Sequence, residues 1–500
     1  MRKGKIAFLL VLISVLTKPI NFIKEVIIAA TFGADEYRDA FLIAWQVPSI
    51  IGGFIFEGLP QIFVPWLIEL RKKDSYNEIL NSVVNLFILI FFVISLLLIF
   101  TSSFWISVIA PFASAKTKKF AMILLKIMAF SILFIGLNNV LTGIIYSYQK
   151  YVIPSLAVPL MNLIVIFFVM FGSKWYGIYS LAWGVLIGSF CAMLLQTLQL
   201  KNEKYKILIM FDKELKKLFI SNVNFFLGTV IFGFSAIVEK IFASKLPTGS
   251  ISCLDYAYHI YQTIFTIFLP ITTVIFPKLC ILATQENEKN FCEVIDKGIR
   301  MIMFFILPIV AILISLKLPI VKFVYQRGVF NEQMAEVTSG IFGIYALGLI
   351  PHSLNYLLIH IFYARKEMNM RVKYSFIFLS VYTVLNLIFI DKLKIYGIVW
   401  SNIISASICT IFFVFNLIKR INLEISEILN SLFKLMIGSV IMWLIMSKLW
   451  TCLGVNLILG FLVSLVVGVI IFFVFIYLFK IIEIKYVKDL LPEIIKIWKR

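Results

Sequence analysis

A few ionisable side chains interrupt the long apolar segments of this chain, and they are the residues that could do chemistry. These residues are Lys18, Lys24, Glu25, Asp39, Glu57, Glu239, Asp255 and His259. A charged group at the depth of a bilayer is costly, so each is a candidate for a functional role. The alternative is that neighbours on one helix, Lys18 with Glu25 or Asp255 with His259, only neutralise each other. Because ammonium groups bind phosphate as point charges, the lysines indicate an anionic ligand such as a diphosphate.

The spacing of these residues places them on shared helix faces. On a helix of about 100° per residue, Lys18, Lys24 and Glu25 fall within one arc of about 120°. Three further stripes follow the same rule, namely Asp39, Gln46, Gly53, Glu57 and Gln61; Asn224, Ser235 and Glu239; and Asp255, Tyr258, His259, Gln262 and Thr266. We therefore expect four polar helix faces that line a hydrated cavity.

The elements that position these faces are predicted by composition. The chain has 500 residues, of which 61% are hydrophobic and only 14% are charged, whereas soluble chains carry about 25% charged residues. Apolar runs long enough to cross a hydrocarbon core of about 30 Å recur along the whole chain. This excludes a water-soluble fold and predicts an all-α integral membrane protein of about fourteen transmembrane helices.

The distribution of basic residues predicts the orientation. A net charge of +20 would suit a nucleic-acid-binding protein, but the lysines and arginines sit in short loops between apolar runs, which speaks against nucleic acid as a partner. Alternate loops, such as 201–217 and 278–300, and the basic tail hold most of them. By the positive-inside rule both termini are cytoplasmic, with the first apolar segment kept as a helix. No connection exceeds about 25 residues, which leaves no room for a soluble catalytic domain.

An internal repeat indicates two related halves. Pro65 and Pro277 lie in register in similar segments that end the second and eighth predicted spans. Asn139 and Asn355 stand at nearly the same separation, and each is followed by aromatic residues and then a lysine, Lys150 or Lys366. A chance match between segments of similar composition is the alternative. We predict a first lobe of six helices over 1–200, a cytoplasmic linker over 201–217, a second six-helix lobe over 218–420, and two further helices with a basic tail over 421–500.

The remaining polar residues are assigned to structure. The asparagines Asn138, Asn139, Asn162, Asn355 and Asn386 are expected to bond between helices. Lys240 and Lys317, near span ends, are expected to extend their ammonium groups to the membrane interface. The six cysteines are scattered without metal-ligand spacing, so we expect neither disulfide nor metal site. No phosphate-binding loop is present, so we expect no cofactor, and an ion gradient or the membrane potential as the drive.

Several segments, taken in order, carry a resemblance to a known family. They are "FIKEVIIAATFGADEYRDAF" with Asp39, "FEGLPQIFVPWL" with Glu57, "LPTGSISCLDYAY", "FPKL", "VYQRGVFNEQ" and "YALGLIPHSLNYLLIHIFYARKE". Together they resemble the MurJ/MviN family of the multidrug, oligosaccharidyl-lipid and polysaccharide exporter superfamily. The resemblance implies a transporter of the bacterial inner membrane that moves lipid II, the peptidoglycan precursor on undecaprenyl diphosphate, outward by alternating access. It also implies a lipid-tail groove on the last two helices, and membrane lipid and the cell-wall synthesis machinery as partners.

The same resemblance assigns roles to the polar residues. Lys18 and Lys24 fall where the family often has arginines that bind the diphosphate, and Asp39 and Glu57 match its functional acidic positions. His259 stands where the family pattern has arginine, and Gly52 and Gly53 replace a basic pair. We therefore expect Lys18, Lys24 and His259 to bind the diphosphate, and the cavity or its gate to contain Asp39, Glu57, Glu25, Glu239 and Asp255.

Three other functions remain as alternatives. The first is export of another polyprenyl-linked glycan, because a less basic cavity fits a changed head group. The second is a membrane glycosyltransferase or ligase, in which Asp35, Glu36 and Asp39 would hold a divalent ion, although the outer loops are short. The third is a multidrug antiporter of the same superfamily, which Lys18 and Lys24 oppose because such a cavity would favour cationic drugs.

Overall fold

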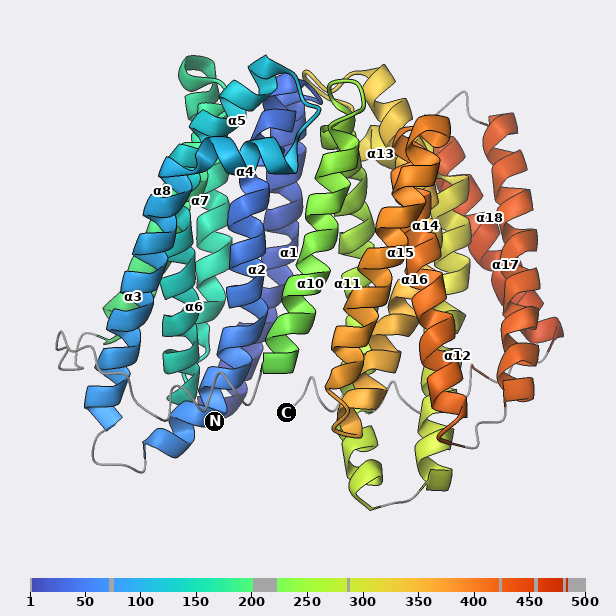
Figure 1. Ribbon diagram of the computed structural model, residues 1–500. Coiled ribbons are helices and arrows are strands. Elements are labelled where there is room, and N and C mark those ends of the chain that lie inside the picture. Colours follow the sequence, from blue (N-terminus) through green and yellow to red (C-terminus); the bar gives the residue numbers. More distant parts are fainter. Residues whose placement is uncertain are drawn as a thin grey trace. The chain divides into compact units, whose positions relative to one another are not determined.

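The computed structural model describes residues 2–71, 76–200, 223–285, 288–421, 425–453, 457–479 and 483, and within these ranges the regular structure is helical throughout (Figure 1). The packing separates the chain into two units. The first unit comprises Met1–Ser252 and Arg327–Phe330, and the second comprises Cys253–Gln326 and Asn331–Arg500.

The helices have the following bounds. In the first unit they are α1 (Arg2–Phe32), α2 (Glu36–Leu70), α3 (Tyr76–Phe100), α4 (Ser102–Ile109), α5 (Ala115–Met128), α6 (Ser131–Ser147), α7 (Val152–Tyr176), α8 (Tyr179–Thr197), the short η1 (Leu198–Leu200) and α10 (Val223–Ala243). In the second unit they are α11 (Ser250–Thr284, whose first residues belong to the first unit), α12 (Glu288–Ser315), α13 (Lys317–Tyr325), α14 (Glu332–Ala364), α15 (Asn369–Leu393), α16 (Ile395–Ile418), α17 (Ile425–Leu453) and α18 (Leu457–Leu478).

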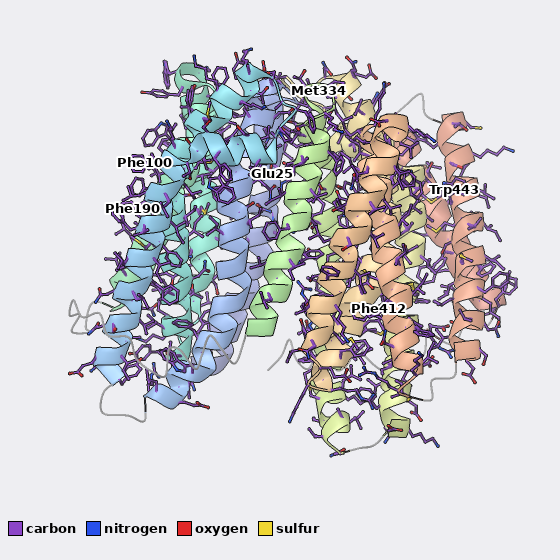
Figure 2. All side chains as sticks on the ribbon, viewed as in Figure 1. Glu25, Phe100, Phe190, Met334, Phe412 and Trp443 are labelled. Atoms are coloured by element: carbon purple, nitrogen blue, oxygen red, sulfur yellow. The ribbon has the colours of Figure 1, made fainter. Side chains whose placement is uncertain are left out.

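Many of these helices are suited to cross a membrane. Among the described residues, nine helical segments are long and apolar enough, or ten if the pair α5 and α6, bent by 41°, counts as one span. Large apolar side chains such as Phe100 and Trp443 lie exposed on the helices, as lipid-facing groups would (Figure 2). The all-helical, multi-span fold is confirmed, and the number of about fourteen crossings stays a prediction.

The packing units depart from the predicted lobe limits at α10 and at the loop Arg327–Phe330, which both fall in the first unit. Helix α10, which the sequence places in the second lobe, packs against α2 and α4 of the first unit. The linker at 201–217 and most of the basic tail lie outside the described residues, so the lobe limits stay a prediction.

Close packing of apolar side chains joins α2, α3 and α6 in the first unit. Phe63, Phe87 and Phe91 are buried together, and the Phe63 and Phe87 rings meet edge to face at 5.7 Å. Gly136 on α6 lets Phe91 approach, because a Cβ at that position would lie 2.4 Å from the Phe91 ring. Lipid tails are as apolar as these side chains, so it is tight packing of small against large residues that favours this helix contact.

The expected role of the asparagines is confirmed for two and wrong for two. The Asn138 side chain accepts a hydrogen bond from Gln196 of α8 at 2.7 Å, and Asn355 donates to the carbonyl of Ala406 on α16 at 2.8 Å. Asn139 and Asn386 instead donate to carbonyl oxygens one turn back on their own helices. An amide side chain in a helix can always reach that carbonyl, so its bond needs no partner helix.

Within the second unit, one arginine of α12 binds carboxylates of the C-terminal segment. Arg300 of α12 is 5% exposed. Its guanidinium pairs with Asp296 at 2.7 Å, with Glu427 of α17 at 3.1 Å and with Glu483 at 3.8 Å. A planar guanidinium presents donors in several directions, so a single side chain can bind carboxylates from three parts of the chain.

The loop Arg327–Phe330 of the first unit docks on the junction between α1 and α2. Helix α1 ends at Phe32, and the left-handed Gly33 donates its N–H to Ala29. The backbone N–H of Val329 donates to the carbonyl of Ala30 at 2.9 Å, beside Gly328, which has φ +59°. A Cβ at Gly328 would lie 2.2 Å from that carbonyl oxygen. Only glycine permits both this backbone conformation and this close approach.

Replacing Gly328 by alanine is expected to destabilise the protein through this contact. The left-handed conformation costs an alanine about 1–2 kcal/mol, and the clash with Ala30 adds about 1–3 kcal/mol. Gly177→Ala is the matched control, because Gly177 has φ +51° but its Cβ would meet nothing within 4 Å. Thermal unfolding of the purified variants measures both effects. Equal losses of stability in the two variants would contradict docking of the loop on Ala30.

Candidate functional site

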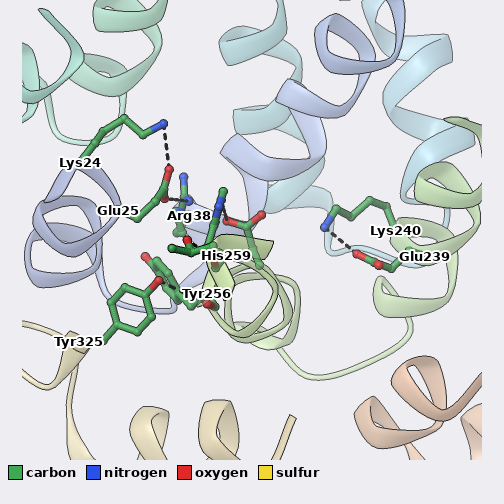
Figure 3. Close-up of polar contacts among 10 residues, drawn as sticks. Lys24, Glu25, Arg38, Glu239, Lys240, Tyr256, His259 and Tyr325 are labelled. Carbon is green, nitrogen blue, oxygen red and sulfur yellow. Dashed lines mark hydrogen bonds and ion pairs between the residues drawn. The ribbon is translucent and has the colours of Figure 1, made fainter. Parts of the chain in front are cut away.

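A buried carboxylate joins two cations at the end of α1 and the start of α2. Glu25 is 5% exposed, and its carboxylate lies 3.0 Å from the Lys24 ammonium and 3.5 Å from the Arg38 guanidinium (Figure 3). Arg38 is itself 2% exposed, whereas the Lys24 side chain is 18% exposed. The three side chains sum to one positive charge, and Lys24 is their more accessible member. This arrangement can attract an anion.

The structure changes one expectation about Lys18 and one about Lys240. Glu25 pairs with Lys24 and Arg38 rather than with Lys18, which is exposed on α1, so the alternative pairing of Lys18 with Glu25 is wrong. Lys240 does not reach toward the interface, because it is 6% exposed and its ammonium lies 3.1 Å from the Glu239 carboxylate (Figure 3). A buried ammonium needs such a partner, which the preceding residue supplies.

Asp39 binds backbone groups of the turn between α10 and α11. Its carboxylate is 5% exposed and accepts hydrogen bonds from the Gly249 N–H at 2.6 Å, the Ser252 N–H at 2.8 Å and the Ser252 hydroxyl at 2.6 Å. The first N–H groups of a helix have no partner within the helix, so a carboxylate is favourable at that end. Asp39 therefore holds the start of α11 against α2.

The acidic cluster in "GADEYRD" is divided among separate partners. Asp35 caps α2 by accepting the Arg38 N–H at 2.8 Å, and burial raises the pKa of the Asp35 carboxyl, against the effect of that hydrogen bond. Glu36 pairs with Lys116 at 2.8 Å and accepts from Ser114 and Thr117. Since Asp39 binds Gly249 and Ser252, the three carboxylates have different partners, which removes the support for a divalent-ion site among them.

In the second unit, the side chains of Asp255 and His259 lie against each other one turn apart on α11. The carboxylate and the imidazole Nε2 are 3.5 Å apart, and both side chains are partly exposed. Tyr258 and Gln262 on the neighbouring turns are exposed. The buried Tyr256 accepts a hydrogen bond from the Tyr325 hydroxyl at 3.3 Å through its carbonyl, which ties α11 to α13 (Figure 3). The expected pairing of Asp255 with His259 is thus observed.

Some predicted residues lie outside the described side chains, and one residue of the site was not predicted. Glu57 lies on α2, but its side chain is outside the part of the chain that the structure describes, as are those of Gly53 and Gln61. Arg38 is a site residue that the sequence analysis missed. It stands within "GADEYRD", three residues after the cap of α2, and its position inside that quoted segment was the available signal.

The comparisons with known proteins agree with one another. Residues 28–468 match the family described as lipid II flippase MurJ. A probable lipid II flippase MurJ of Buchnera aphidicola subsp. Schizaphis graminum is 29% identical over 447 residues, which are 86% of this chain and 86% of that protein. Its counterpart from Aquifex aeolicus is 27% identical over 433 residues, 83% of this chain and 84% of that protein.

Solved structures show the same relationship. A lipid II flippase MurJ in an inward closed conformation superposes with a TM-score of 0.83 at 25% identity, covering 97% of this chain and all of that one. An inward-facing multidrug resistance transporter of the MATE family gives a TM-score of 0.69 at 12% identity, covering 82% and 98%, which shows a shared fold alone. Because the family match spans most of the sequence, the chain belongs to the lipid II flippase MurJ family of multi-pass membrane transporters and is not an enzyme.

Proposed function

We propose that this chain carries lipid II from the inner to the outer leaflet of the bacterial inner membrane by alternating access. Family membership supports the activity, and the buried cluster of Lys24, Glu25 and Arg38 is the observation that carries the proposed chemistry. We further propose about fourteen crossings, two six-helix lobes followed by a helix pair, and cytoplasmic termini, on the basis of span lengths and loop charges. An ion gradient or the membrane potential would supply the drive.

The diphosphate is proposed to bind Lys24. Glu25 holds the Lys24 ammonium at 3.0 Å, and an arriving phosphate would replace that carboxylate. Arg38 keeps Glu25 in place from the other side, at 3.5 Å, so the released carboxylate still has a cationic partner. The exchange replaces one ion pair by another, which keeps the cost of desolvating the charged groups low.

The exchange of Glu25 for the diphosphate at Lys24 also fits a transport cycle. A site that only binds tightly does not move its ligand, because transport requires the affinity to differ between conformations. A carboxylate that competes with the diphosphate for the same ammonium supplies that difference if the two conformations change the distance from Glu25 to Lys24. Glu25 would then favour release in the conformation that restores the ion pair.

A second candidate is export of another glycan on the same kind of lipid carrier. The observation that favours it is the pairing of His259 with Asp255 at the position where the family pattern has arginine. A histidine balanced by a carboxylate binds phosphate less strongly than a permanently charged guanidinium.

The activity is tested by depleting the essential lipid II flippase of a bacterial host while this chain is expressed. We expect growth and the outer-leaflet lipid II, followed with a labelled probe, to be restored, because the chain would supply the missing transport. Immunoblotting of membranes controls for insertion. A chain present in the membrane that restores neither would contradict lipid II transport and would support the second candidate.

Charge reversal at Lys24 is expected to abolish this rescue. Lys24→Glu places a second carboxylate beside Glu25 and repels the diphosphate, so transport should fall by at least about tenfold, whereas Lys24→Arg keeps the charge and should retain activity. Lys116→Gln is the matched control, because Lys116 also pairs with a glutamate but its side chain is 56% exposed. Full rescue by Lys24→Glu would rule out the proposed role in binding the head group.

Substitution of Asp39 is expected to lower the stability of the protein, and to reduce transport only as a consequence. Asp39→Asn turns an acceptor into an NH₂ donor that faces the N–H groups of Gly249 and Ser252, which should cost about 1–3 kcal/mol. Asp391→Asn is the control, because Asp391 is exposed at the end of α15 and such surface changes stay within about 0.5 kcal/mol. Thermal unfolding is measured beside transport. Unchanged stability with lost transport would show instead that Asp39 contacts the substrate or a coupling ion.

A further inference from the structure

We propose that Tyr258 and Gln262 of α11 form a platform that binds the saccharide part of the transported lipid. This inference rests on the proposed function and names the group of the substrate that the second unit recognises. It also gives α11 a role different from the diphosphate binding that the sequence analysis assigned to His259.

The first argument is the exposure of polar side chains on one face of α11. Tyr258 is 43% exposed, Gln262 one turn later is exposed, and Asp255 and His259 beside them are partly exposed. An amide, a carboxylate and an imidazole on one helix face are unfavourable against lipid, so this face is expected to meet water or a polar ligand. By contrast, the exposed faces of α17 and α18 carry mainly apolar side chains such as Phe433, Trp443 and Phe473.

The second argument is the rigid support of the Tyr258 ring. Its centroid lies 5.8 Å from the ring of Tyr261 and 5.9 Å, edge to face, from that of Tyr345 on α14. Tyr261 and Tyr345 are 5% and 3% exposed and stack on each other at 5.5 Å. A ring held in this way loses little freedom when a ligand binds, and tyrosine offers a large amphipathic surface for contact.

The third argument is charge. Asp255 and His259 lie 3.5 Å apart, and their face offers a carboxylate beside an imidazole, whereas the first unit places two permanent cations, Lys24 and Arg38, around the single carboxylate of Glu25. A face without an excess of positive charge suits an uncharged group that is rich in hydroxyl and amide groups. The Gln262 amide can donate and accept, and the Asp255 carboxylate can accept from hydroxyls. Sugars with acylated amino groups fit this description, and a diphosphate does not.

The experiment compares lipids that differ only in their sugars. The full-length chain in nanodiscs is titrated with undecaprenyl diphosphate, with the same lipid bearing one amino sugar, and with lipid II, and the dissociation constants are measured by native mass spectrometry. The variants are Tyr258→Leu, which removes the aromatic platform, and Gln262→Leu, which removes the amide. Tyr477→Leu is the matched control, because Tyr477 is 84% exposed on α18, away from this face of α11.

We expect Tyr258→Leu and Gln262→Leu each to weaken binding of the two sugar-bearing lipids by roughly threefold to tenfold and to leave undecaprenyl diphosphate unaffected. Unchanged binding of lipid II by both variants, or an equal loss for all three lipids, would overturn the platform. Should one variant fold poorly, the other decides.

The two levels of proposal fail in different ways. If the unaltered chain does not bind lipid II, the proposed function fails. If it binds lipid II and the two variants bind it equally well, only the platform fails.

Discussion

A charge buried in an apolar chain must have a partner, and the first unit is arranged around that constraint. Glu25 is nearly inaccessible and lies between Lys24 on its own helix and Arg38 on the next. Removing Glu25 from this set would take away the carboxylate that Lys24 and Arg38 share, which is strongly destabilising. The pairing therefore fixes how the end of α1 meets the start of α2. It also leaves Lys24 as the cation that a ligand can reach.

The carboxylate of Asp39 extends this arrangement to the start of α11. It accepts two backbone N–H groups and one hydroxyl, so a helix end that would otherwise hold unsatisfied donors is bound to α2. Because the Asp39 carboxylate is only 5% exposed, water has little access to replace these bonds. Two acidic residues within the same part of the first unit thus have different tasks, one between cations and one at a helix terminus.

Glycines allow the close backbone contacts at the junction between α1 and α2. Gly328 lets its loop donate to the carbonyl of Ala30, and Gly249 lies where a Cβ would be 2.5 Å from the carbonyl oxygen of Ala34. Deeper in the unit, Gly136 admits the Phe91 ring. Because association of helices in lipid is driven by close packing and polar contacts, these glycines contribute to the stability of the helix contacts although they have no side chain.

The sequence by itself determined the class of the protein, because apolar runs and loop charges reflect the requirements of the bilayer and not of any particular packing. It also identified Lys24, Glu25, Asp39, Asp255 and His259 as unusual, since an ionisable residue in an apolar segment is visible in one dimension. Tertiary structure decided what each of them contacts. Arg38 joins Glu25 across two helices, Lys240 is buried rather than at the interface, and α10 packs with the first unit. These outcomes depend on which residues of separate helices meet, and helical periodicity gives the face of a residue but not the neighbour that the face will have.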